Sequence, residues 1–274
     1  MNAKDTTELT SARAKLTSHK RIVIKIGTSS LTYSSGKLNL QRIEKLCRVI
    51  TDLYNQGREM ILVTSGAIAV GADCLNLGDR PRDIQGKQAA SAVGQAMLMQ
   101  IYQQFFSIYN RRIAQILLTQ DILDLQDRKI NARNTFNALL AMGVVPIVNA
   151  NDTVATDELD DASDNDRLSA HVAVLSQSNL LVMLSDIEGL YDSDPRTSPN
   201  AAFYHEIREI TPELELVAGG AGSSLGTGGM ATKLIAARRT LDNGIDAIIA
   251  SGEDPAILWK IMNGEQVGTL FTTE

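Results

Sequence analysis

The chain of 274 residues is 44% hydrophobic and 21% charged, an ordinary globular composition with enough length to bury a sizeable core. Its 26 basic and 32 acidic residues give a formal net charge of −6, which argues against nucleic acid or an anionic membrane as the main partner. Two cysteines are too few for a disulfide framework, and the chain has neither 18 consecutive apolar residues nor a signal-peptide core. We therefore expect a cytoplasmic protein with no membrane partner.

The first half of the chain opens with a polar segment, residues 1–18, which lacks apolar periodicity and is predicted to be a flexible N-terminal extension. A β-branched strand is predicted over 21–26. An amphipathic helix follows, which begins near Asn39 and stops at Gly57. A second apolar strand covers 60–63, and a long helical stretch over 84–109 leads to a strand over 113–118.

The second half continues this alternation of helices and apolar strands. Helices are predicted over 130–142, 168–176 and 230–243, and strands over 144–148, 180–184 and 245–250. Uniformly apolar strands that alternate with helices are typical of a parallel sheet covered on both faces. No linker or repeat divides the chain, so we predict one α/β domain over 19–274, a three-layer αβα sandwich around a mainly parallel sheet.

The turns that follow the strands are where sheets of this kind bind ligands. Lys25 ends the first strand and precedes Gly27 and several hydroxyls. It could present an ammonium group to phosphate, although a strand-end lysine that reaches solvent has the same pattern. Ser65 lies in the turn after the second strand, where a hydroxyl suits either a small polar ligand or a helix N-cap.

The segment from 149 to 169 is rich in carboxylates, with six between 157 and 166. Most of them are expected to belong to a solvated acidic loop. Asp152, Asn165 and Asp166 flank apolar elements instead and are better candidates for a site. A calcium loop is not supported, because the EF-hand spacing with its final Glu is absent.

A glycine-rich stretch with six glycines between 219 and 229 precedes a helix that carries Lys233 in its first turn. Backbone N–H groups, the helix dipole and this lysine favour an anion site, and a disordered loop is the alternative. The stretch contains a G-x-G-x-x-A match over 226–231, but no opening strand precedes it, so the dinucleotide fingerprint is weak. No P-loop motif occurs in the sequence.

The histidines form no recognisable pair with a serine or cysteine nucleophile, which bears on the class of reaction. Phosphorylation of an alcohol needs a proton acceptor, whereas a carboxylate with a pKa of about 4 is already ionised at neutral pH. An enzyme that phosphorylates a carboxylate therefore supplies mainly positioning and positive charge.

Six motifs in the chain resemble, in order, those of the amino acid kinase family, and within it the branch that phosphorylates free L-glutamate. They occupy residues 23–29, 63–69, 149–156, 164–170, 184–191 and 226–233, and the resemblance spans about residues 21–271. It implies ATP- and Mg²⁺-dependent phosphorylation of the side-chain carboxylate of L-glutamate to L-glutamyl 5-phosphate, the first step of proline biosynthesis. The PUA domain that many relatives append is expected to be absent, because the chain ends at Glu274.

The same resemblance implies roles for individual residues. Lys25 and Lys233 would neutralise the transferring phosphoryl group, and Asp166 would hold the two lysines in register. The residues expected to bind the substrate are Ser65, Asp152 and Asn165. Those expected to contact ATP are Lys25, Ser185, Asp186, Thr227, Gly228, Gly229, Met230, Ala231, Thr232 and Lys233. No residue is assigned as a metal ligand.

Two positions depart from the family pattern: Ala150 stands where Glu is usual, and Ser185 where Thr is usual. The alternatives are a kinase of the same fold acting on N-acetylglutamate, aspartate or carbamate, a non-catalytic amino-acid sensor, and, more distantly, a nicotinamide-dependent dehydrogenase. The resemblance further implies a homo-oligomer that is inhibited by proline and whose product passes to glutamyl phosphate reductase.

Overall fold

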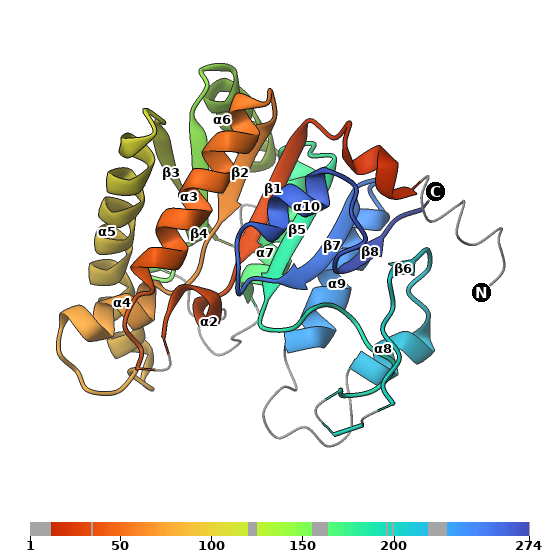
Figure 1. The fold of residues 1–274 in the computed structure, drawn as a ribbon. Helices are drawn as coiled ribbons and strands as arrows, with labels where there is room; N and C mark the ends of the chain where they lie inside the picture. Colours follow the sequence, from red (N-terminus) through yellow and green to blue (C-terminus); the bar gives the residue numbers. More distant parts are fainter. Residues whose placement is uncertain are drawn as a thin grey trace, which may run out of the picture.

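The computed structural model describes residues 12–33, 35–119, 125–154, 164–195, 197–198, 200–218 and 229–273. Within these ranges, the strands form one eight-stranded sheet in the order β3-β4-β2-β1-β5-β7-β8-β6 (Figure 1). Their bounds are β1 (Arg21–Ile26), β2 (Glu59–Val63), β3 (Ile113–Leu118), β4 (Val145–Ala150), β5 (Leu180–Ser185), β6 (Glu206–Ile207), β7 (Asp246–Ser251) and β8 (Thr269–Phe271).

Parallel pairing dominates this sheet. Strand β1 lies at its centre and pairs in parallel with both β2 and β5, so that Lys25 stands opposite Val63 on one side and Met183 on the other. The pairs β2–β4, β3–β4, β5–β7 and β6–β8 are also parallel, and β7–β8 is antiparallel. The predicted mainly parallel sheet is confirmed, and the carboxyl ends of its central strands share one edge.

Helices cover both faces of the sheet. Those in the described ranges are α2 (Thr28–Leu31), α3 (Leu40–Asn55), α4 (Ala67–Cys74), α5 (Ile84–Ile108), α6 (Gln126–Ala141), α7 (Asp164–Leu175), α8 (Pro212–Ala218), α9 (Gly229–Leu241) and α10 (Ile257–Met262). Asn39 caps α3 as predicted, because its side chain accepts a hydrogen bond from the backbone N–H of Arg42. In the described part of the chain, no helix combines the length and apolar character needed to cross a membrane.

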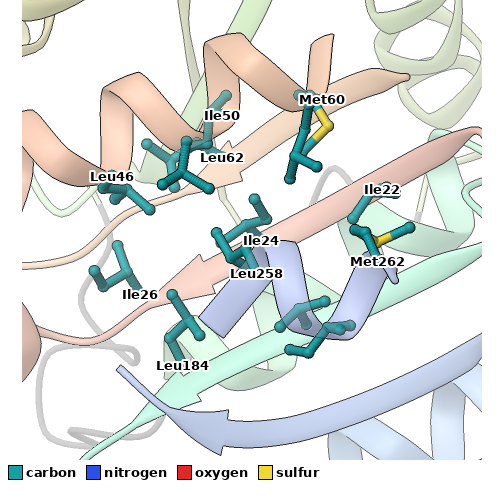
Figure 2. Close-up of a cluster of buried hydrophobic side chains, with 14 of the residues drawn as sticks. Ile22, Ile24, Ile26, Leu46, Ile50, Met60, Leu62, Leu184, Leu258 and Met262 are labelled. Atoms are coloured by element: carbon teal, nitrogen blue, oxygen red, sulfur yellow. The ribbon is translucent and has the colours of Figure 1, made fainter. Parts of the chain in front are cut away.

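The alternation of side chains along β1 separates the two cores. Ile22, Ile24 and Ile26 pack with α3, α5 and α10 on one face, as Figure 2 shows for part of this cluster. Val23 points to the opposite face, where the core includes buried residues of α6, α7 and α9. Because successive side chains of a strand face opposite sides, one continuous apolar strand serves both cores. The predicted three-layer αβα architecture is confirmed.

Two helices begin earlier than their apolar periodicity indicates. The structure starts α7 at Asp164 instead of residue 168, and α6 at Gln126 instead of residue 130. First-turn residues of a helix are commonly polar, because the first backbone N–H groups have no partner within the helix and polar side chains can accept hydrogen bonds from them. The consequence for α7 is functional, since Asn165 and Asp166 lie in its first turn.

The N-terminal expectation needs correction. Residues 12–16 are helical, and Leu16 is completely buried, so the flexible extension predicted over 1–18 does not reach residue 18. The guanidinium group of Arg13 donates hydrogen bonds to the backbone carbonyls of His205, Glu265, Val267 and Gly268. This short amphipathic turn was missed because only two apolar residues, Ala12 and Leu16, mark its buried side. Residues 1–11 lie outside the described residues.

We expect Arg13→Ala to lower the free energy of unfolding by about 2–4 kcal/mol, because it removes four hydrogen bonds to partly buried or buried backbone carbonyls. Urea denaturation measures the change. Arg48→Ala is the matched control. Arg48 is exposed on α3 and, within the described part of the chain, forms an ion pair with Glu44 one turn away, so its loss should cost about 0.5 kcal/mol or less. Equal effects of the two substitutions would contradict the proposed anchoring role of Arg13.

Candidate functional site

Side chains from several elements converge at the carboxyl edge of the central strands. Lys25 lies near the end of β1, Ser65 follows β2, Asp152 follows β4, and Ser185 ends β5. Parallel strands bring these positions to one edge, because each strand runs in the same direction and is joined to the next by a crossover. The structure therefore brings to one edge four of the residues that the sequence singled out.

Asp166 links two lysines that are far apart in the sequence. The Lys25 Nζ atom lies 2.6 Å from Asp166 Oδ1, and the Lys233 Nζ atom lies 3.2 Å from Asp166 Oδ2. All three side chains are buried, with exposed fractions of 9% for each lysine and 4% for Asp166. Two ammonium groups on one carboxylate leave a formal charge of +1. The predicted bridging position of Asp166 agrees with this geometry.

Burial and charge act in opposite directions on these groups. Burial alone would raise the pKa of Asp166, but the ammonium charges of Lys25 and Lys233 and their hydrogen bonds bring that pKa below its ordinary value. Desolvation lowers the pKa of Lys25 below its ordinary value. The charge of Lys233 lowers this pKa further, whereas the charges of Asp166 and Asp186 raise it. The charge of Asp186 therefore acts on Lys25.

The first turn of α9 positions Lys233. The Lys233 Nζ atom also donates to the carbonyl of Gly229, at 2.9 Å, and the hydroxyl of Thr232 donates to Asp166 Oδ2 at 3.1 Å. The Asp166 carboxylate thus joins β1, α7 and α9. Lys233 bends back along its own helix, because helical side chains point toward the N-terminus. The link between Thr232 and Asp166 was not predicted from the sequence.

A second contact joins the turn after β2 to α7. The Asn165 Nδ2 atom donates to the hydroxyl of Ser65 at 2.7 Å, and Ser65 is buried. Asn165 Oδ1 is also buried and has no hydrogen-bond partner among the described residues. Gly66 adopts a left-handed conformation with φ of 96° at the start of α4, which a residue with a side chain adopts only with strain. Ser65 and Asn165 therefore form one polar cluster.

Asp152 and Asn149, near the end of β4, each contact a residue of α5 that the sequence analysis did not identify. The hydroxyl of Ser91, on α5, donates to Asp152 Oδ2 at 2.8 Å. One turn further along α5, the Oε1 atom of Gln95 accepts from Asn149 Nδ2, also at 2.8 Å. Ser91 and Gln95 are buried polar residues four positions apart, so they lie on one face of α5, and no local pattern in the sequence marks them.

The expected nucleotide-binding residues are only partly described. Ser185 donates through its hydroxyl to Asp186 Oδ1 at 3.0 Å, and its carbonyl accepts from the N–H of Gly252. Thr227 and Gly228 lie outside the described residues. Gly229, Ala231 and Thr232 lie in the first turn of α9 with Lys233, and Met230 packs against the core. Ala150 is buried at the end of β4, where it packs in the apolar core and offers no charge.

This arrangement suits a multiply charged anion. The paired lysines and the N-terminal turn of α9 together supply positive charge at the edge where ligands of parallel sheets bind. Among the described residues, no group of three or more His, Cys, Asp or Glu side chains is placed to hold a metal ion. The described side chains therefore fit anion binding and do not themselves form a metal cage.

Comparison with known proteins shows the relationships of the chain. The model of the amino acid kinase family matches residues 20–251. A glutamate 5-kinase of Clostridium perfringens is 52% identical over 96% of this chain and 98% of its own length. Glutamate 5-kinases of Listeria monocytogenes and Enterococcus faecalis are 50% and 51% identical, over 96% and 94% of this chain and 96% and 97% of their own lengths.

Solved structures support the same fold. UMP kinase of Bacillus anthracis superposes with a TM-score of 0.62 at 18% identity, over 93% of this chain and 97% of its own. UMP kinase of Ureaplasma parvum gives a TM-score of 0.63 at 17% identity, over 93% and 99% of the two chains. At these identities the likeness concerns the fold alone.

The low pKa of Asp166 predicts how acid affects stability. The folded carboxylate holds its proton less tightly than the unfolded one, so the stabilisation is present above pH 4 and is lost as the pH falls through the folded pKa. Between about pH 5 and pH 3, the unfolding free energy of the wild type should fall more steeply than that of Asp166→Asn, by at most about 1.4 kcal/mol per pH unit.

Urea unfolding at a series of pH values measures this difference. Lys25→Met removes one of the two cations that lower the pKa of Asp166, so its slope should lie between those of the wild type and Asp166→Asn. Parallel curves for all three proteins would show that the ion pairs do not perturb Asp166.

Proposed function

This chain belongs to the amino acid kinase family, and we propose that it catalyses the glutamate 5-kinase reaction. It transfers the γ-phosphoryl group of ATP to the side-chain carboxylate of L-glutamate and forms L-glutamyl 5-phosphate, the first step of proline biosynthesis. The observation that carries the proposal is the buried carboxylate of Asp166 between the ammonium groups of Lys25 and Lys233. The high identity to glutamate 5-kinases over nearly the whole chain supports the substrate.

The reaction needs charge and alignment more than proton transfer. A carboxylate oxygen of the substrate forms the new bond to the γ-phosphorus, and the bond from that phosphorus to the β–γ bridging oxygen breaks. ADP leaves with the electron pair, and no proton moves because the substrate carboxylate is already ionised. Lys25 and Lys233 stabilise negative charge on the transferring oxygens, and Asp166 keeps the two ammonium groups at fixed positions.

The substrate is held at its amino acid end by Ser65, Asp152 and Asn165. Asp152 can accept a charge-assisted hydrogen bond from the free ammonium of L-glutamate, worth about 1.5–3 kcal/mol. The Oδ1 atom of Asn165, which is buried and has no hydrogen-bond partner among the described residues, offers a second acceptor. An acidic residue beside an anionic substrate is consistent with the free amino group as its target.

ATP is contacted by Ser185, Asp186 and the segment from Thr227 to Lys233. The Mg²⁺ ion that accompanies ATP would be carried by the phosphates and by water, since Mg²⁺ keeps several water ligands and binds few protein groups. Among the described side chains, no group of three or more His, Cys, Asp or Glu is placed to hold this ion.

We further propose the partners that the family likeness implies. Proline, a small amino acid without a side-chain carboxylate to phosphorylate, inhibits the enzyme by sharing the ammonium and carboxylate contacts of glutamate. The product is an acyl phosphate that hydrolyses readily, and it passes to glutamyl phosphate reductase in the cytoplasm. The enzyme acts as a homo-oligomer.

A substrate panel tests the activity. With ATP and Mg²⁺, L-glutamate should give an acyl phosphate that hydroxylamine traps as the hydroxamate, while N-acetylglutamate, aspartate and carbamate should give essentially none. Acetylation removes the ammonium charge and leaves the Asp152 carboxylate without a cation in a covered site, which costs more than the lost bond. A preference for N-acetylglutamate would refute the substrate assignment, and binding of glutamate without any product would favour a non-catalytic sensor.

Loss of either lysine should reduce turnover far more than glutamate binding. A charged donor to the transferring phosphoryl group is worth about 3 kcal/mol or more in the transition state, so Lys25→Ala and Lys233→Ala should each lower kcat by at least about 100-fold. Steady-state kinetics measures kcat and KM separately. Lys45→Ala is the matched control, because Lys45 is paired with Asp254 on the surface and should leave turnover within about twofold.

If either buried-lysine variant keeps near-normal turnover, its assigned role in the transfer step is wrong.

A further inference from the structure

Helix α5 contacts the segment around the end of β4 through two buried side chains. Ser91 donates to the carboxylate of Asp152, and Gln95 accepts from the amide of Asn149, each at 2.8 Å. The exposed fractions of Ser91 and Gln95 are 2% and 7%. The bond between Gln95 and Asn149 is buried and that between Ser91 and Asp152 is partly buried. A hydrogen bond shielded from water in this way is stronger than one at the surface.

A third side chain of α5 reaches the turn after β2. The hydroxyl of Tyr102 lies 2.8 Å from that of Thr64, the residue before Ser65, and both side chains are buried. Residues 91, 95 and 102 are separated by four and seven positions, the spacing of one helical face. One face of α5 therefore binds the two strand ends that carry the expected substrate residues.

Close packing against α4 sets the position of this face. A Cβ atom on Gly71 would lie 1.7 Å from the carbonyl oxygen of Ala90, and one on Gly94 would lie 1.8 Å from that of Ala67. The backbones of α4 and α5 therefore touch on either side of Ser91, as the adjacent ribbons of Figure 1 show. With no room for sliding, the hydroxyl of Ser91 is fixed beside Asp152.

We propose that Ser91 is a positioning residue that orients the Asp152 carboxylate toward the ammonium group of the substrate. This inference rests on the proposed function, because it assigns a supporting residue to the same site. A carboxylate offers about four acceptor positions, so the bond from Ser91 restricts its rotation without using its capacity for an ammonium group. Orientation of this kind affects ligands that carry the ammonium and leaves others unaffected.

Glutarate tests the inference, because it is L-glutamate without the amino group. In Ser91→Ala the KM for L-glutamate should rise about 10-fold, the effect of one weakened hydrogen bond to a charged group. The inhibition constant of glutarate, measured against glutamate, should stay within about twofold, as should the KM for ATP and kcat. A merely structural defect would weaken the binding of L-glutamate and of glutarate to the same extent.

Three further variants sharpen the experiment. Ser91→Cys keeps a side chain of similar size with a weaker donor. Like Ser91→Ala, it should raise the ratio of the KM for L-glutamate to the inhibition constant of glutarate. Asp152→Asn should shift it at least as far. Ser176→Ala removes another buried serine hydroxyl and should leave the ratio unchanged. Among the described residues, that hydroxyl bonds to the carbonyls of Val172 and Ala173 at the end of α7 and to Ser178.

The outcomes separate the two proposals. An active Ser91→Ala enzyme with an unchanged ratio, or with equal losses for glutamate and glutarate, overturns the role of Ser91 and leaves the proposed function intact. A wild type that does not phosphorylate L-glutamate overturns the proposed function and this inference with it.

Discussion

The buried carboxylate of Asp166 is the interaction on which the rest of the site depends. Two ammonium groups brought close together out of water repel each other, and each also loses hydration worth several kcal/mol. One carboxylate between them reduces both costs and still leaves a net positive charge for an anion. The Asp166 carboxylate also joins β1, α7 and α9. One side chain therefore both reduces the repulsion between the two ammonium groups and fixes the relative positions of three elements.

The sheet makes this meeting possible. Lys25 lies one residue before the end of β1, an apolar strand that is buried on both faces, and a charged side chain can leave such a strand only near its end. There the carboxyl ends of neighbouring strands and the first turns of α7 and α9 converge. The site is therefore built from rigid elements at their ends, which favours the fixed geometry that electrostatic stabilisation of a transition state requires.

Much of this could be predicted from the sequence, and the exceptions have physical reasons. The parallel sheet followed from apolar strands that alternate with helices. Lys25 stood out because Gly27 and several hydroxyls follow it, and Lys233 because a glycine-rich stretch precedes it. The contacts of Ser91 and Gln95 could not be predicted, because they depend on how α5 packs on α4 and not on local pattern. The short antiparallel strand β8 carries too few residues to give a periodicity, and its place is fixed by pairing with β7.

The anchoring of Arg13 has a consequence for the order of events during synthesis. Its carbonyl partner at Gly268 lies 255 residues further along the chain. At a translation rate of about 5–20 residues per second, the ribosome needs on the order of 10 to 50 s to make the intervening chain. The turn over residues 12–16 emerges early but cannot complete its hydrogen bonds until the far end has been made. Translation therefore sets the earliest time at which this region can finish folding, and until then the Arg13 side chain lacks these carbonyl partners.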